Sequence, residues 1–137
     1  MEEHFSKLQE LYLSAKINSR LFPTSTIEIR AKEATISLEV SDNYHHGFNA
    51  MHGAIYFKLL DDAAYFAVNS VVQDQLVVTS TFNTQLLRPH KTGKLIATGT
   101  LTFASRSLFY AESEIKNTEG KIIAKGQGQF MKSGIKF

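Results

Sequence analysis

The segment from Gly53 to Ser70 places two neighbouring carboxylates, Asp61 and Asp62, in a run that is otherwise almost wholly apolar. Its apolar residues cover nearly the whole circumference of a helix instead of one stripe, which is typical of a helix buried on all sides. Acidic side chains are almost never fully buried unless they are paired. Each acid therefore needs a partner, and the rest of the chain must supply a surface that wraps this helix.

One cation in the same segment can reach either acid. Lys58 precedes Asp61 by three residues and Asp62 by four, so an ion pair along the helix surface is available to both. We expect Asp62 to take Lys58. Asp61 is then either an acid satisfied by neighbouring hydroxyl groups or a group with a chemical role.

The strands that would wrap the helix lie mostly after it. Four segments rich in threonine, valine, isoleucine and phenylalanine predict strands over 76–88, 94–105, 108–117 and 121–131, with turn residues between them. Taken in order, they favour an antiparallel meander. At about 3.3 Å per residue the first would extend roughly 40 Å, longer than most strands, so we expect a strongly curved sheet.

The part of the chain before the central helix predicts a helix, a hairpin and a loop. Apolar residues recur every three or four positions from Glu3 to about Arg20, which indicates a peripheral amphipathic helix that Pro23 ends. Alternating patterns predict strands over 26–31 and 34–40, and 41–51 has the composition of a loop. Without internal repeats or linkers, residues 1–137 predict a single α+β domain.

Composition argues against several classes of function. The chain has no cysteine, hence no disulfide framework, thiolate zinc site or cysteine nucleophile. Its net charge is only +2 and its basic residues are scattered, so we expect no nucleic-acid partner. No apolar stretch approaches the roughly 20 residues that cross a bilayer. The acidic start argues against a secretory signal, so we expect a cytoplasmic protein with no membrane partner.

Three histidines near the start of the central helix raise the question of a metal site. His45, His46 and His52 lie close together in the sequence, but neither a Glu-x-x-His helix nor a cysteine accompanies them. We therefore predict no metal and no cofactor. His52 is expected to brace the loop that enters the helix.

Short motifs follow one another over most of the chain, from about Asn43 to Met131. In chain order they are His52-Gly53, Leu60-Asp61, Asn69-Ser70, the strand from Thr79 to Pro89, Gly93, Arg106 and Gly120-Lys121. This pattern resembles that of the hotdog-fold acyl-CoA thioesterases, in particular the subgroup named for phenylacetic acid degradation. The resemblance implies the hotdog fold, a curved antiparallel sheet wrapped around a long central helix, here with a peripheral N-terminal helix.

The resemblance also implies catalytic roles. Asp61 would act as general base toward water or as nucleophile through a mixed anhydride, and Thr79 matches a hydroxyl that holds the water or the carboxylate. The backbone amide of Gly53, at the positive start of the helix, would donate to the oxyanion. Asp61 lies about 12 Å further along the axis, too far to serve the same carbonyl. The family's homodimer, with its site at the subunit interface, accounts for that gap, and a dimer of dimers is a further assembly to consider.

The chain departs from the family pattern in the loop before the helix. His46 stands where the family has Asn, Asn49 where it has Gly, and Ala54 replaces the second motif glycine. Either ring nitrogen of His46 can substitute as a donor, or the ring can face water. Arg106 matches the position that meets the CoA phosphates, which suits guanidinium geometry, although a solvated charge is the alternative. The expected substrate contacts are completed by Asn49 and Ser107, and by Arg88 and His90, which we expect at a sheet end near Arg106. The aromatic residues are expected to line the pocket or to belong to the core: Phe48, Tyr56, Phe57, Tyr65 and Phe82.

These observations predict an acyl-CoA thioesterase that releases a free acid and CoA. Because His46 and Asn49 depart from the family pattern, an alternative hypothesis is a non-catalytic protein that binds an acyl-CoA or another acyl ligand. A third reading, the hydratase or dehydratase branch of the fold, uses a differently arranged histidine and carboxylate that nothing in this chain requires. The partner is an acyl-CoA or an acyl-carrier thioester.

Overall fold

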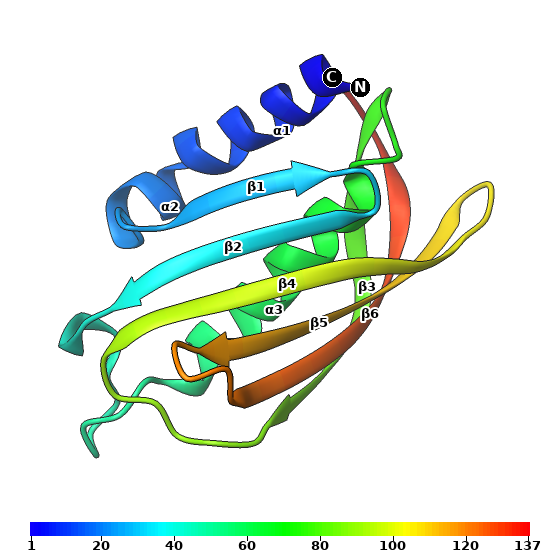
Figure 1. Ribbon diagram of the computed structural model, residues 1–137. Helices are drawn as coiled ribbons and strands as arrows, with labels where there is room; N and C mark the ends of the chain where they lie inside the picture. Colours follow the sequence, from blue (N-terminus) through cyan, green and yellow to red (C-terminus); the bar gives the residue numbers. More distant parts are fainter.

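The computed structural model describes residues 1–137, and a six-stranded antiparallel sheet curves around one long helix (Figure 1). The strands are β1 (Thr26–Arg30), β2 (Glu33–Val40), β3 (Gln75–Leu86), β4 (Gly93–Ala104), β5 (Leu108–Asn117) and β6 (Ile122–Lys136). The central helix α3 (Gly53–Asn69) contacts every strand. The hotdog fold expected from the sequence is confirmed.

Two short helices, α1 (Glu2–Ser14) and α2 (Lys16–Leu21), lie beside β1 at one edge of the sheet (Figure 1). The prediction of one helix from 3 to 20 is wrong in this respect. Ala15 has φ −55° and ψ 131°, which turns the chain out of the helical path after its amide has closed α1 on the Leu11 carbonyl. The turn brings Asn18 inward, where its side-chain amide donates to the Tyr12 carbonyl at 2.8 Å. The apolar residues keep the same spacing on both sides of Ala15, so the sequence pattern does not reveal the break.

The order of strands in the sheet is β1-β2-β4-β5-β6-β3, so the expected antiparallel meander is found for β4, β5 and β6 but is wrong for β3. β3 pairs with β6 at the far edge, and β4 lies between β2 and β5. One physical reason lies in β6: a Cβ atom on Gly126 or Gly128 would stand 2.5 Å from the ring of Phe82 in β3. The two glycines therefore make room for that ring on the neighbouring strand.

The helix lies unusually close to the middle of the sheet. A Cβ atom on Gly99 in β4 would stand 2.1 Å from the Ala63 carbonyl oxygen, so only glycine allows this approach. Ala63, Ala64 and Ala67 give α3 a slim face there, and all three are fully buried. Larger apolar side chains fill the space on either side of this contact. The close approach fixes the height of α3 above the sheet, and with it the position of Asp61.

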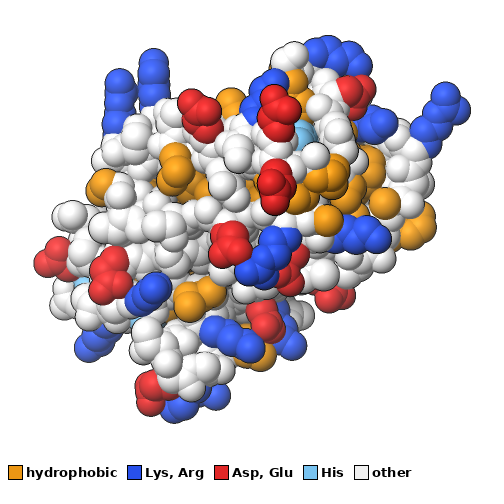
Figure 2. Space-filling view, turned by 45° about the horizontal axis from the view of Figure 1, so that its top comes forward, with side chains coloured by type: hydrophobic (Ala, Val, Ile, Leu, Met, Phe, Trp, Pro, Cys, Tyr) orange, Lys and Arg blue, Asp and Glu red, His pale blue; other side chains and the backbone are white.

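No helix is long and apolar enough to cross a membrane. The face in Figure 2 carries lysine and arginine side chains interspersed with aspartate and glutamate, without a field of one sign.

Candidate active site

Three contacts join α3 to β3 at intervals of about one helical turn. A Cβ atom on Gly53 would lie 3.4 Å from Leu86 Cδ1. The rings of Phe57 and Phe82 meet edge to face, with centroids 5.5 Å apart. Next, Thr79 Oγ1 donates to Asp61 Oδ1 at 2.8 Å. Positions 53, 57 and 61 share one face of the helix, so the two candidate residues of α3, Gly53 and Asp61, both face β3.

Asp61 is a partly buried carboxylate with one hydrogen-bond partner. The pKa of Asp61 is raised to about 6. Burial is the main cause and the neighbouring Asp62 charge adds to it, while the Thr79 hydroxyl and Lys58 oppose the shift. A carboxyl group with a pKa near 6 is ionised at neutral pH and still basic enough to accept a proton from water. A group with a pKa perturbed in this way is a candidate for acid–base chemistry.

Asp62 is the partner of Lys58, as expected from the spacing. Lys58 Nζ donates to Asp62 Oδ2 at 2.6 Å, and both side chains are largely buried. Burial raises the pKa of Asp62, and the Lys58 cation opposes that shift. The two adjacent acids therefore differ in kind, because one is held in an ion pair and the other faces β3.

The start of α3 is capped by His52. Its Nδ1 accepts a hydrogen bond from the Ala54 amide at 2.9 Å, and its own amide donates to the Tyr44 carbonyl. His52 thus fixes the loop against the helix. The Gly53 amide, one of the first-turn donors that a helix leaves unpaired, donates to no acceptor within the chain.

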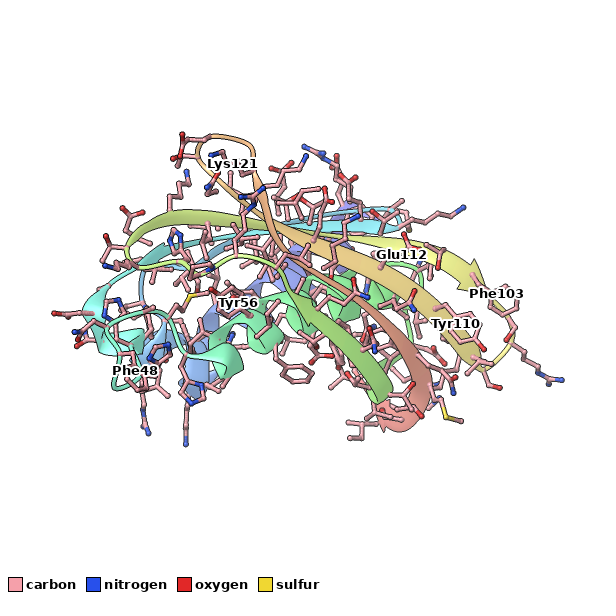
Figure 3. The ribbon with its side chains drawn as sticks, turned by 90° about the horizontal axis from the view of Figure 1, so that it is seen from below. Phe48, Tyr56, Phe103, Tyr110, Glu112 and Lys121 are labelled. Atoms are coloured by element: carbon pink, nitrogen blue, oxygen red, sulfur yellow. The ribbon has the colours of Figure 1, made fainter.

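A shallow pocket of about 290 Å³ opens at this helix start, and it brings together His46, Gly53 and Arg88 with the apolar Leu86 and Leu87. His46 Nδ1 accepts from the Phe48 amide at 3.0 Å, which leaves its other ring nitrogen available. Figure 3 shows Phe48 and Tyr56 at this same end of the molecule. His46 and Arg88, whose side chains carry hydrogen-bond donors, therefore line the same pocket as the free Gly53 amide.

The remaining candidates of this end have structural partners. Asn49 adopts a positive φ of 62° in the loop turn, which suits asparagine. His90 Nε2 lies 3.2 Å from the Gly93 carbonyl, and its own carbonyl accepts from the Met51 amide. Tyr56, which was expected only as an aromatic residue of pocket or core, donates from its hydroxyl to the Arg88 carbonyl at 2.9 Å and ties the β3–β4 connection to α3.

Arg106 and Ser107 lie in the turn between β4 and β5, where both are exposed. The sequence interpretation set Arg88 and His90 near Arg106, and this is wrong within one subunit. β4 runs between the two groups over Gly93–Ala104, roughly 40 Å of strand. Phe103 and Tyr110, at the base of the turn, lie at the opposite end of the molecule from Phe48 (Figure 3).

Other hollows of the surface lack this chemistry. One of them, of about 440 Å³, is lined by residues of β3 to β6 without a hydrophobic side chain, including Thr98, Glu112 and Gln127. Glu112 points away from α3 (Figure 3). No three histidine, aspartate or glutamate side chains lie close enough together to hold a metal ion.

Sequence reasoning named Phe57 and Phe82 only as aromatic residues of core or pocket. In the structure Phe57 remains 43% exposed beside β3, so an exposed aromatic ring lies between Gly53 and Asp61 on this face of α3. Leu86 and Leu87 are half exposed at the same edge and were not singled out. No local signal marks them, because their exposure depends on β3 being an edge strand.

Comparison with known proteins gives a family and a set of similar folds. A model of the thioesterase superfamily matches residues 48–124. No curated protein gave a match. The PaaI protein from the Escherichia coli phenylacetic acid degradation operon superposes with a TM-score of 0.88 at 23% identity, over 98% of this chain and 96% of that chain. Zebrafish thioesterase superfamily member 2 gives 0.82 at 16% identity, over 94% and 98%.

A mutant of the phenylacetic acid degradation protein PaaI from Thermus thermophilus gives a TM-score of 0.77 at 21% identity, over 87% of this chain and all of that chain. These likenesses show the fold. The family match covers more than half of the chain, including the helix start, Asp61 and Thr79. The chain therefore belongs to the thioesterase superfamily, as its motifs predict.

Proposed function

We propose that the protein is an acyl-CoA thioesterase with Asp61 as its reactive carboxylate. The observation that carries this proposal is the Asp61–Thr79 pair. A single hydroxyl donor holds a carboxylate that has no ion pair and a pKa near 6, on the face of α3 that meets β3, in a thioesterase-superfamily fold. Such a group can activate water at neutral pH, which thioester hydrolysis requires.

In the general-base route, Asp61 accepts a proton from water while the oxygen attacks the thioester carbon. The carbonyl electrons move onto oxygen, where the free Gly53 amide at the positive end of α3 donates to the oxyanion. The intermediate then collapses, the carbon–sulfur bond breaks, and the thiolate leaves and takes a proton. In the nucleophilic route Asp61 itself attacks, and water hydrolyses the resulting mixed anhydride.

The reaction needs two subunits, because Asp61 and Gly53 are about 12 Å apart along one helix. β3 is an edge strand, and its exposed apolar side chains Val78, Leu86 and Leu87, together with Phe57 of α3, favour a partner at this edge. A second copy related by a two-fold axis would bring Asp61 of one subunit toward Gly53 of the other.

The same two-fold pairing supports the proposed substrate contacts. Opposite ends of the two molecules become neighbours, so the exposed Arg106 and Ser107 of one subunit approach the pocket with Arg88, His90 and Asn49 of the other. CoA phosphates would lie between these groups. Light scattering measures whether the assembly is a dimer or a dimer of dimers, and Val78→Arg should dissociate the pair and abolish hydrolysis.

The direct test is a panel of aryl, short-chain, medium-chain and long-chain acyl-CoA thioesters, with an acyl-carrier thioester alongside, assayed for free thiol. The wild-type protein should release thiol from at least one substrate, and Asp61→Asn should reduce the rate by a factor of about 100 or more. Asp74→Asn, the matched change at an exposed acid paired with Lys136, should retain hydrolysis. A wild-type protein that cleaves no thioester would refute the proposal. Single turnover in ¹⁸O-water separates the two routes, since label in Asp61 indicates the nucleophile.

A second candidate function is the binding of an acyl ligand without cleavage. It is favoured by His46, which replaces a family asparagine and commits Nδ1 to the Phe48 amide. Tight binding of an acyl-CoA with no turnover, measured by calorimetry on the same panel, would establish this function and exclude the first.

A further inference from the structure

The cation nearest to Asp61 is held away from it by residues outside α3. Lys58 Nζ donates to Asp62 Oδ2 at 2.6 Å and to Asn18 Oδ1 of α2, also at 2.6 Å. Lys58 forms no salt bridge with Asp61, although the spacing along the helix allows one. The side chain of Lys58 is only 14% exposed, so its ammonium group depends on these two acceptors.

Asn18 is itself fixed in orientation. It is buried, and its side-chain nitrogen donates to the Tyr12 carbonyl at 2.8 Å. The oxygen of the same amide must then face Lys58. The Phe22 ring, 4.5 Å from Lys58 Nζ, and the Tyr12 ring, at 5.3 Å, complete an aromatic wall around the cation. The N-terminal helices thus form a binding site for the Lys58 ammonium group, away from the face of α3 that meets β3.

We propose that Asn18 and Lys58 are positioning residues for Asp61: α2, through Asn18, holds the Lys58 ammonium on Asp62 and so keeps Asp61 free to act as a base. This inference rests on the proposed function, and it gives α1 and α2 a role in the chemistry although neither helix supplies a hydrogen bond to Asp61. Without the Asn18 acceptor, Lys58 would divide its contacts between the two acids.

The groups that face Asp61 are few. From α3 they are Asp62, Lys58 and Tyr65, and from β3 the hydroxyl of Thr79. Asp62 raises the pKa of Asp61 and Lys58 lowers it. Moving the Lys58 cation from Asp62 to Asp61 should therefore lower the pKa of Asp61 and make it a weaker base.

Three substitutions give a pattern of signs that tests the proposal. Asp62→Asn removes a negative charge and releases Lys58, so the titration midpoint of Asp61 should fall by about one pH unit. Asn18→Ala removes the second acceptor and should also lower the midpoint. Lys58→Met removes the cation, so the midpoint should rise. Asn18→Ala is the discriminating variant, because Asn18 carries no charge and a merely structural role for it would leave the midpoint unchanged.

The midpoint is measured in two ways. Carbon NMR titration of the aspartate carboxyl groups reports it without any substrate, with the Asp61 signal assigned from Asp61→Asn. The acidic limb of the pH profile of kcat/KM reports the same group in the working enzyme. Lys136→Met is the control, because it breaks the exposed ion pair with Asp74 and should leave the Asp61 midpoint unchanged.

The proposal is overturned if the Asp61 midpoint is the same in wild-type protein and in folded Asp62→Asn, or if Asn18→Ala and Lys58→Met move it in the same direction. Asp62→Asn is isosteric, so it keeps the test decisive if Asn18→Ala does not fold. A protein whose NMR titrations follow the expected signs but which hydrolyses no thioester would refute the proposed function and support the positioning of Lys58.

Discussion

Replacing Asp61 by asparagine should stabilise the fold at neutral pH while it removes the proposed activity. The carboxylate is partly buried, receives one hydrogen bond from Thr79 and has no cation of its own. Asparagine has nearly the same shape, and its side-chain oxygen can still accept the Thr79 hydrogen bond. The substitution therefore removes the cost of holding a charge at this position and little else.

The size of the effect follows from the pKa of Asp61, raised from 3.8 to about 6. A pKa difference of one between the folded and unfolded states corresponds to about 1.4 kcal/mol. Without solvent screening, the charge on Asp61 would therefore lower the free energy of unfolding by roughly 3 kcal/mol. Solvent reaches part of the side chain and screens the charge, so we expect about 1–2 kcal/mol. Because the folded state holds this proton more tightly than the unfolded chain, the cost is absent below pH 3.8, grows between pH 3.8 and about 6, and is constant above that.

Urea unfolding at pH 7.5 and pH 4 measures the prediction. The Asp61→Asn protein should exceed the wild type by about 1–2 kcal/mol at pH 7.5, or roughly 3–8 °C in Tm, and most of the gain should be lost at pH 4. Asp74→Asn is the matched control, since this exposed acid pairs with Lys136 and its pKa is lowered, so its replacement should not stabilise the fold. An Asp61→Asn protein that is less stable at pH 7.5, or equally stabilised at both pH values, would refute the reasoning.

Three further substitutions test other parts of the structure. Gly99→Ala should lower the free energy of unfolding by about 1–3 kcal/mol, since the added Cβ would lie 2.1 Å from the backbone of α3, whereas Gly47→Ala, which meets nothing within 4 Å, should not. Thr79→Val removes the donor to Asp61 and should move the acidic limb of the kcat/KM profile to higher pH. Ser70→Ala should cost about 1 kcal/mol in urea unfolding, because the Lys32 amide in the β1–β2 turn loses the hydroxyl of the buried Ser70 as its acceptor.

Local sequence patterns determined the elements and one of the site's contacts. The all-round apolar helix over 53–70 is observed as Gly53–Asn69, and the four later strands lie close to their expected positions. The Lys58–Asp62 ion pair followed from a spacing of four residues. These features depend on neighbours one helical turn or two strand positions apart, which a sequence displays directly.

Only the tertiary structure decided which distant segments meet. β3 lies at an edge beside β6 because the Phe82 ring fits over Gly126 and Gly128, and this choice of partner leaves Phe57 exposed beside Asp61. The break at Ala15 turns Asn18 toward Lys58. Arg106 and Arg88 fall at opposite ends of one subunit because a full strand separates them. Such pairings depend on how well side chains far apart in the chain fit together, and the apolar periodicity of a single segment does not show that fit.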